Sequence, residues 1–153
     1  EKYCHPTMGY NSRVDEVQAS LLRAKLPYLN GWNAERRRLA GSYRSFISGH
    51  VSTPLDRADS EHVYHLYVIA TPSRDRLQTY LRSPGIDTLI HYPIPIHRQR
   101  AFPPLDLKLR SLPVTDEAAA TVLSLPLYPG MTDEAVQTVS AAILEFCREE
   151  EPS

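Results

Sequence analysis

The sequence predicts an α+β fold in which helices pack with a small antiparallel sheet. Two long segments with apolar residues at helical spacing come first, over residues 14–26 and 31–47. Shorter segments rich in β-branched and aromatic residues follow and are mixed with further helical segments. The length of 153 residues fits one domain, for which about 100–200 residues are usual.

The first two helices are defined by their apolar spacing and by the residues at their ends. We expect the first over residues 14–26, with Ser12 or its neighbour as the N-cap. Pro27 should end or kink it, because proline lacks a backbone N–H. The second helix resumes near Gly31 and reaches the region of Gly49, a residue type suited to a helix C-terminus. Its apolar stripe consists of Trp32, Leu39, Tyr43, Phe46 and Ile47.

Two later segments are predicted to be strands. His62–Ala70 is β-branched and aromatic on both faces, which is typical of a buried strand. Ile86–Tyr92 is predicted as a second strand that runs into a proline-rich loop. Between them, Ser73 is expected to cap a short helix over Arg74–Arg82.

Two further helices complete the predicted fold. Thr115 opens one that continues to about Leu123, and Thr132 opens the last. The acidic residues 149–151 are expected to fray. One face of the last helix is expected to be buried, and it carries Val136, Val139, Ile143 and Phe146.

The composition excludes several classes of partner. Seventeen basic and eighteen acidic residues leave a net charge of −1, so nothing points to nucleic acid or to an anionic membrane. No apolar run approaches the roughly 20 residues needed to cross a bilayer. Cys4 and Cys147 are far apart in the sequence and form no CxxC motif, which favours a reduced, cytoplasmic location.

A polar turn precedes the first predicted helix, with the sequence Gly9-Tyr10-Asn11-Ser12-Arg13. Free backbone N–H groups at a helix start, an amide on Asn11 and a guanidinium on Arg13 would suit an anion. The alternative is an ordinary N-cap followed by a surface arginine. The pattern alone leaves both interpretations open.

A second candidate segment is the loop His91-Tyr92-Pro93-Ile94-Pro95-Ile96-His97. Two prolines stiffen it, and His91, Tyr92 and His97 could contact a polar ligand. The alternative is a packed connector whose prolines end a strand.

Other chemistries have less support. Neither His91 with His97 nor His62 with His65 has the spacing or the neighbouring ligands of a typical zinc site. We therefore expect no metal, and interpret His62 as an ordinary strand or surface histidine. The sequence lacks the G-x-S-x-G motif of serine hydrolases and the glycine-rich motifs of nucleotide binding.

Five segments, in order along nearly the whole chain, resemble the DegT/DnrJ/StrS family of pyridoxal-phosphate (PLP)-dependent sugar aminotransferases. The resemblance implies the aspartate-aminotransferase fold (fold type I). Residues 32–153 would be its C-terminal small domain, and residues 1–31 an inter-subunit loop and a linking helix from the large domain. The N-terminal large domain with the PLP lysine would be absent. The five segments are GYNSRVDEVQASLLRAKL (9–26), WNAERRRLAGSY (32–43), HVYHLYVI (62–69), GIDTLIHYPIPIH (85–97) and LSLPLYPGMTDEAV (123–136).

The resemblance also implies a reaction and a shared site. Family members transfer an amino group, usually from glutamate, to a nucleotide-linked keto-sugar. They use pyridoxal 5′-phosphate, and they are homodimers whose active sites are shared between subunits. Asn11 would reach the cofactor phosphate of the neighbouring subunit, and Arg13 would bind phosphate or a substrate carboxylate nearby. His91, Tyr92 and His97 would border the substrate pocket.

The lysines limit what the chain is expected to do alone. The chemistry needs a lysine that forms a Schiff base with PLP and an aspartate paired with the pyridinium nitrogen. In the family both precede the N-S-R motif, and Lys2, Lys25 and Lys108 do not match the Schiff-base context. We therefore expect an inactive C-terminal part of an aminotransferase.

A second hypothesis is a non-catalytic binding, oligomerisation or regulatory module derived from the same family. The apolar face of the helix over 14–26 argues against a stand-alone module, because it needs a partner surface. The sequence does not identify the sugar, the carbon or the nucleotide. It also does not separate an aminotransferase from the sugar dehydratases of the family.

Overall fold

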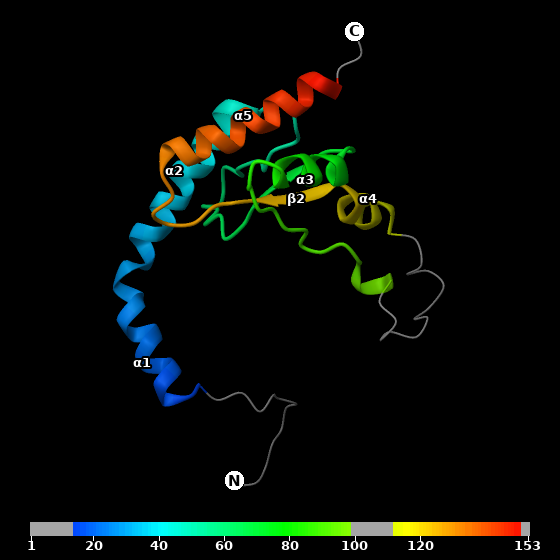
Figure 1. The fold of residues 1–153 in the computed structure, drawn as a ribbon. Helices are drawn as coiled ribbons and strands as arrows, with labels where there is room; N and C mark the ends of the chain where they lie inside the picture. The colour runs from blue at the N-terminus through cyan, green and yellow to red at the C-terminus, as the bar shows by residue number, and fades with distance from the viewer. Residues whose placement is uncertain (1–13, 99–111, 151–153) are drawn as a thin grey trace. The chain divides into compact units, whose positions relative to one another are not determined.

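The computed structural model describes residues 14–98 and 112–150. Contacts within the chain divide it into two compact units that meet between Gly31 and Trp32. The helix α2 (Leu29–Ile47) begins in the first unit, and the second unit holds the rest of α2 and all later elements (Figure 1).

The first unit is built on the helix α1 (Glu16–Lys25), all of whose residues are exposed. The carboxylate of Asp15 accepts hydrogen bonds from the backbone N–H of Val17 at 2.8 Å and of Gln18 at 3.3 Å. The N-cap is therefore Asp15, and the prediction of a cap at or beside Ser12 is wrong, because the helix begins further along the chain. Pro27 ends the α-helix as predicted, since the 3₁₀ turn η1 (Leu26–Tyr28) separates α1 from α2.

The helix α2 forms one wall of the core of the second unit. Leu39, Tyr43 and Ile47 recur at helical spacing and are fully buried. Phe46 is exposed, so the buried stripe is narrower than predicted. Gly49 has a φ of 93° just after the helix, a backbone conformation that glycine adopts without strain.

A two-stranded antiparallel sheet pairs β1 (Tyr67–Ala70) with β2 (Val122–Leu125). Single antiparallel bridges continue it at both edges, with Ser52 opposite Ala70 and Leu89 opposite Ser124. The small antiparallel sheet predicted from the sequence is therefore confirmed, although its strands are shorter than expected.

Three boundaries predicted for the sheet are wrong. Tyr64 has a φ of 47°, and its backbone N–H donates to Nδ1 of His62, so irregular backbone with a bend replaces the first part of the strand predicted over 62–70. The strand predicted over 86–92 is reduced to the bridge at Leu89. The helix α4 (Pro113–Thr121) ends before Leu123, and Val122 begins a strand that the sequence analysis missed.

The helix α3 (Arg74–Arg82) lies between β2 and α5 (Asp133–Glu150) (Figure 1). Leu77 and Leu81 of α3 are fully buried. The buried face of α5 is confirmed, and it consists of Val136, Val139, Ile143 and Phe146.

The ends of α3 and α5 are joined by Glu150. Ser73 occupies the N-cap position of α3, but its hydroxyl donates to the Glu150 carboxylate at 2.8 Å and makes no cap bond. Arg76 also donates to Glu150 at 2.8 Å. The predicted helix over Arg74–Arg82 and the place of Ser73 at its start are thus confirmed, but the side-chain cap bond is absent because the hydroxyl is used by Glu150. The predicted fraying at residues 149 and 150 is wrong, since α5 is helical to Glu150. Residue 151 lies outside the described residues.

Candidate functional site

The loop after Leu89 carries three of the predicted site residues, His91, Tyr92 and His97. Its start is fixed by two backbone bonds to the middle of β2. The Ser124 N–H donates to the Leu89 carbonyl at 2.8 Å, and the Leu89 N–H donates to the Ser124 carbonyl at 3.2 Å. The loop ends in the 3₁₀ turn η2 (Ile96–Arg98).

A pocket of about 280 Å³ lies between this loop and the segment that runs from α4 into β2. Its lining is mostly apolar, and His91 and Thr115 supply an imidazole and an aliphatic hydroxyl. His91 and Tyr92 therefore meet at one cavity, with Tyr92 75% exposed at its side. His97 is not among the lining residues, which are His91, Tyr92, Ile94, Pro95, Ile96, Thr115, Ala118, Ala119 and Val122.

The imidazole of His91 is held from two sides. Its Nδ1 lies 2.9 Å from Oγ of Ser124, a β2 residue that is only 5% exposed. Its ring meets the ring of Tyr92 edge-on, with centroids 5.4 Å apart and planes at 85°. The side chain of His91 thus has one defined orientation beside the pocket.

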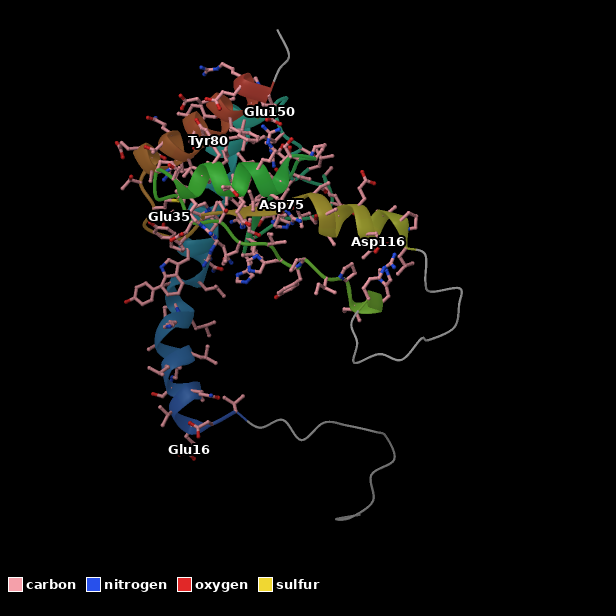
Figure 2. All side chains as sticks on the ribbon, turned by 45° about the vertical axis from the view of Figure 1, so that its right-hand side comes forward. Glu16, Glu35, Asp75, Tyr80, Asp116 and Glu150 are labelled. Carbon is pink, nitrogen blue, oxygen red and sulfur yellow. The ribbon has the colours of Figure 1, made fainter. Side chains whose placement is uncertain are left out.

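The far end of the loop is pinned to α4 by Asp116 (Figure 2). Nε2 of His97 lies 3.1 Å from one carboxylate oxygen of Asp116, and Arg98 donates to both oxygens at 3.2 and 2.8 Å. The hydrogen bond from Arg98, with burial opposing it and His97 adding to it, lowers the pKa of Asp116. The His97 side chain is only 11% exposed and contacts Asp116. In this structure it therefore braces the loop.

The residues expected to bind the cofactor, Asn11 and Arg13, lie outside the described residues. Lys25 is the one lysine that the structure describes, and it is exposed at the end of α1. The lining of the His91 pocket, as described, contains no lysine. Within 14–98 and 112–150, no group of three or more His, Cys, Asp or Glu side chains could hold a metal ion.

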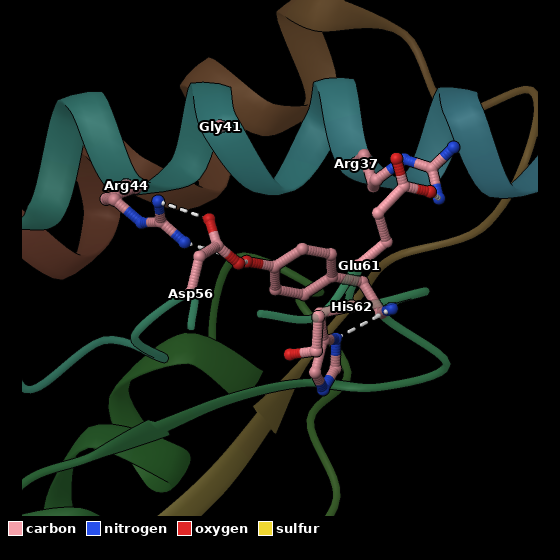
Figure 3. Close-up of a pocket in the computed structure, with 8 residues that line it drawn as sticks. Arg37, Gly41, Arg44, Asp56, Glu61 and His62 are labelled. Atoms are coloured by element: carbon pink, nitrogen blue, oxygen red, sulfur yellow. Dashed lines mark hydrogen bonds and ion pairs between the residues drawn. The ribbon is translucent and has the colours of Figure 1, made fainter. Parts of the chain in front are cut away.

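A second pocket, of similar size, lies beside α2 and is dominated by paired charges (Figure 3). Arg44 donates to Asp56 at 2.7 Å, to the Tyr64 hydroxyl at 2.7 Å and to the Pro54 carbonyl at 3.2 Å. The Tyr64 hydroxyl also donates to Asp56. These bonds fasten the loop before β1 to α2, so we assign them to the fold rather than to ligand binding.

Acidification is expected to weaken this clamp. The hydrogen bond from Arg44, followed by that from Tyr64, lowers the pKa of Asp56. Its stabilising effect is therefore complete above the unfolded-state value of about 3.9 and is lost as the pH falls through the lower folded-state value. Urea unfolding midpoints measured between about pH 5 and pH 2 should fall less steeply in Asp56→Asn than in the unchanged chain.

Asp59→Asn is the matched control for that measurement. Asp59 pairs with Arg57 only two residues away, and both side chains are exposed. Such a local surface pair contributes little to folding. We expect Asp59→Asn to leave the fall of the urea midpoint with pH almost unchanged. If Asp59→Asn reduced that fall as much as Asp56→Asn does, the role of the clamp would be contradicted.

The sequence matches one protein family over most of its length. Residues 1–144 match the DegT/DnrJ/EryC1/StrS aminotransferase family. The chain belongs to this family. Among the family's relatives, a pleiotropic regulatory protein of Geobacillus stearothermophilus is 41% identical over 151 residues, which are 96% of this chain and 41% of that protein.

A named transaminase of this family is almost as similar. The dTDP-3-amino-3,4,6-trideoxy-alpha-D-glucose transaminase of Streptomyces venezuelae is 39% identical over 148 residues, 95% of this chain and 39% of that protein. The family member described here thus spans about two fifths of the length of these relatives.

The fold agrees with solved structures of the family. The crystal structure of S. venezuelae DesV superposes with a TM-score of 0.85 at 38% identity, and the match covers 100% of this chain and 41% of that one. The prediction of an α+β small domain of the aspartate-aminotransferase type is confirmed. No helix of the described residues is long and apolar enough to span a membrane.

Proposed function

We propose that this chain is the C-terminal part of a PLP-dependent aminotransferase that transfers the amino group of glutamate to a nucleotide-linked keto-sugar. The observation that carries the proposal is the His91–Tyr92 pocket, in a chain that matches 41% of the length of S. venezuelae DesV with all of its own residues. A relative at 39% identity is named as a transaminase for a dTDP-linked amino sugar.

The chain's own residues would bind and orient the ligands. PLP, when bound, supplies the electron sink for amino-group transfer. Asn11 and Arg13 would hold the cofactor phosphate, with Asn11 reaching the site of the second subunit in a homodimer. His91 and Tyr92 would contact the sugar or the diphosphate from the pocket, and His97 would keep the loop in place through Asp116.

The surface of α1 supports an assembled enzyme. Val17, Leu21 and Leu22 are 59–68% exposed, and an exposed apolar helix face of this kind commonly marks a surface that another part of a protein covers. We propose that the rest of the aminotransferase covers it in the cytoplasm, and that the Schiff-base lysine comes from there.

A regulatory role is the second candidate. It is favoured by one observation, the 41% identity to a relative named a pleiotropic regulatory protein. Under this alternative the same pocket would bind a nucleotide sugar without turnover.

The proposed absence of a Schiff-base lysine can be tested directly. The purified chain is mixed with PLP and reduced with borohydride, and labelled lysines are mapped by mass spectrometry. We expect no stoichiometric label on Lys2, Lys25 or Lys108. A single fully labelled lysine would contradict the proposal that the covalent site lies elsewhere.

Catalytic function requires a second measurement. The chain is fused behind the N-terminal three fifths of the S. venezuelae transaminase and assayed for glutamate-dependent amination of a dTDP-linked keto-sugar. We expect turnover, and a loss of about tenfold or more in kcat/KM for the matched variant His91→Ala, because one hydrogen bond to a charged or strongly polar group is removed. A soluble, PLP-loaded fusion that binds the sugar without turnover would favour the regulatory alternative.

A further inference from the structure

Ser124 of β2 contacts His91, one of the residues that line the pocket. In the sheet it stands opposite Val68 of β1, and its backbone N–H and C=O both bond to Leu89 on the other side. Its backbone is therefore held on both sides. The hydroxyl meets Nδ1 of His91 at 2.9 Å.

The direction of this hydrogen bond follows from counting hydrogens. A serine hydroxyl has one hydrogen to donate and two lone pairs, and a neutral imidazole has one N–H and one bare nitrogen. If Nδ1 carried the proton and donated to Ser124, the serine hydrogen would need another acceptor. The structure gives Oγ of Ser124 no second partner among the described residues, and at 5% exposure water has little access. The count of hydrogens therefore favours donation from the hydroxyl to Nδ1.

We propose that Ser124 is a positioning residue for His91. By donating to Nδ1 it leaves the proton of the neutral ring on Nε2, so His91 offers an N–H donor to an oxygen atom of a ligand in the pocket. Apart from His91, the polar side chains of the described lining are Thr115 and Tyr92, and Tyr92 is 75% exposed. This inference has two parts. The hydrogen bond to a ligand, which is its ligand half, rests on the proposed function, whereas the tautomer of His91 does not.

The class of ligand group follows from the donor. An Nε2–H pairs with an acceptor such as a sugar hydroxyl, a carbonyl or a phosphate oxygen, all of which a nucleotide-linked keto-sugar carries. The apolar walls formed by Ile94, Ile96 and Ala119 offer no hydrogen bonds of their own from side chains. The pocket would then orient such a ligand by the hydrogen bond from His91, beside the hydroxyls of Tyr92 and Thr115, in mostly apolar surroundings.

Long-range ¹H–¹⁵N correlation of the histidine-labelled chain, at about pH 8.5 where an ordinary imidazole is neutral, measures the tautomer directly. We expect His91 to be protonated on Nε2, with the Nδ1 resonance shifted by an accepted hydrogen bond. Ser124→Ala should abolish that shift and Ser124→Thr, which keeps the hydroxyl, should restore it. Unchanged amide shifts in β1 and β2 would show that the sheet is intact.

The outcome in the unchanged chain is decisive whether or not the variants fold. A proton on Nδ1 of His91 would overturn the proposal, and so would an Nδ1 shift that Ser124→Ala leaves unaltered in a folded chain.

The ligand half is tested in the fusion enzyme. Ser124→Ala should raise KM for the keto-sugar about three- to tenfold while kcat changes little, and Ser124→Thr should recover it. If Ser124→Ala left KM unchanged while His91 had the expected tautomer, the inference that His91 binds a ligand oxygen would be overturned. A fusion without turnover would refute the proposed function, and the tautomer would still decide the role of Ser124.

Discussion

Tyr43→Ala is expected to lower the free energy of unfolding by about 3–5 kcal/mol, the range for removal of a buried aromatic ring. Tyr43 is fully buried on α2, and its ring stacks on Tyr67 of β1 with centroids 5.0 Å apart and planes at 22°. Its hydroxyl donates to the carbonyl of Pro126, directly after β2, at 2.9 Å. The substitution would therefore leave a cavity between helix and sheet and an acceptor without its donor.

Two conservative variants separate the ring from the hydroxyl. Tyr43→Phe keeps the ring and loses the bond to Pro126, so we expect a cost of about 1 kcal/mol. The hydroxyl of Tyr67 is buried without a partner among the described residues. Tyr67→Phe should accordingly be neutral or stabilising by up to about 1 kcal/mol, because a desolvated donor is removed.

Urea unfolding followed by circular dichroism measures all three variants. Equal losses in Tyr43→Phe and Tyr67→Phe would show that the two hydroxyls are equally satisfied, against the observed hydrogen bonding. A loss below about 1 kcal/mol in Tyr43→Ala would show that the stacked pair is not central to the core.

Arg74→Leu is expected to cost about 2–3 kcal/mol, because a nearly buried cation that bonds two backbone carbonyls would be lost. Arg74 is 7% exposed, and its Nη1 donates to the carbonyls of Ala119 at 3.3 Å and Val122 at 3.2 Å. These carbonyls lie where α4 ends and β2 begins. The guanidinium thus satisfies acceptors at a helix C-terminus, where positive charge is also favourable.

The same substitution should loosen the candidate site. Thr115 and Asp116 stand on α4 and Ser124 stands on β2, so both anchors of the His91–His97 loop depend on this junction. In Arg74→Leu, the rate of amide hydrogen exchange should rise more in α4 and β2 than in α5. Arg74→Lys, whose ammonium is a compact charge without the fork of a guanidinium, should restore only part of the stability.

Exchange that rises equally in α5 would contradict the local role of Arg74 and indicate a global loss of stability. Full recovery in Arg74→Lys would show that charge alone, rather than the geometry of the two hydrogen bonds, holds the junction.

The sequence alone determined those parts of the protein that depend on local periodicity or on motif chemistry. The buried faces of α2 and α5 follow from apolar residues at helical spacing, as with Leu39 and Tyr43 or Val136 and Ile143. Pro27 breaks the first helix because its ring and missing N–H act locally. The five motifs were enough to identify the family, since residues 1–144 match it.

Tertiary structure decided the features that depend on partners distant in the sequence. The pattern of a segment as short as 122–125 is compatible with a helix end and with a strand. Pairing with β1 decides that it is the strand β2. The strand predicted from His62 is cut short at Tyr64, which has a positive φ and is hydrogen-bonded to Arg44 and Asp56. The anchors of the loop, Ser124 for His91 and Asp116 for His97, are brought to it by folding. No periodicity encodes such pairs, because hydrogen bonds between side chains depend on the position of the backbone that carries them.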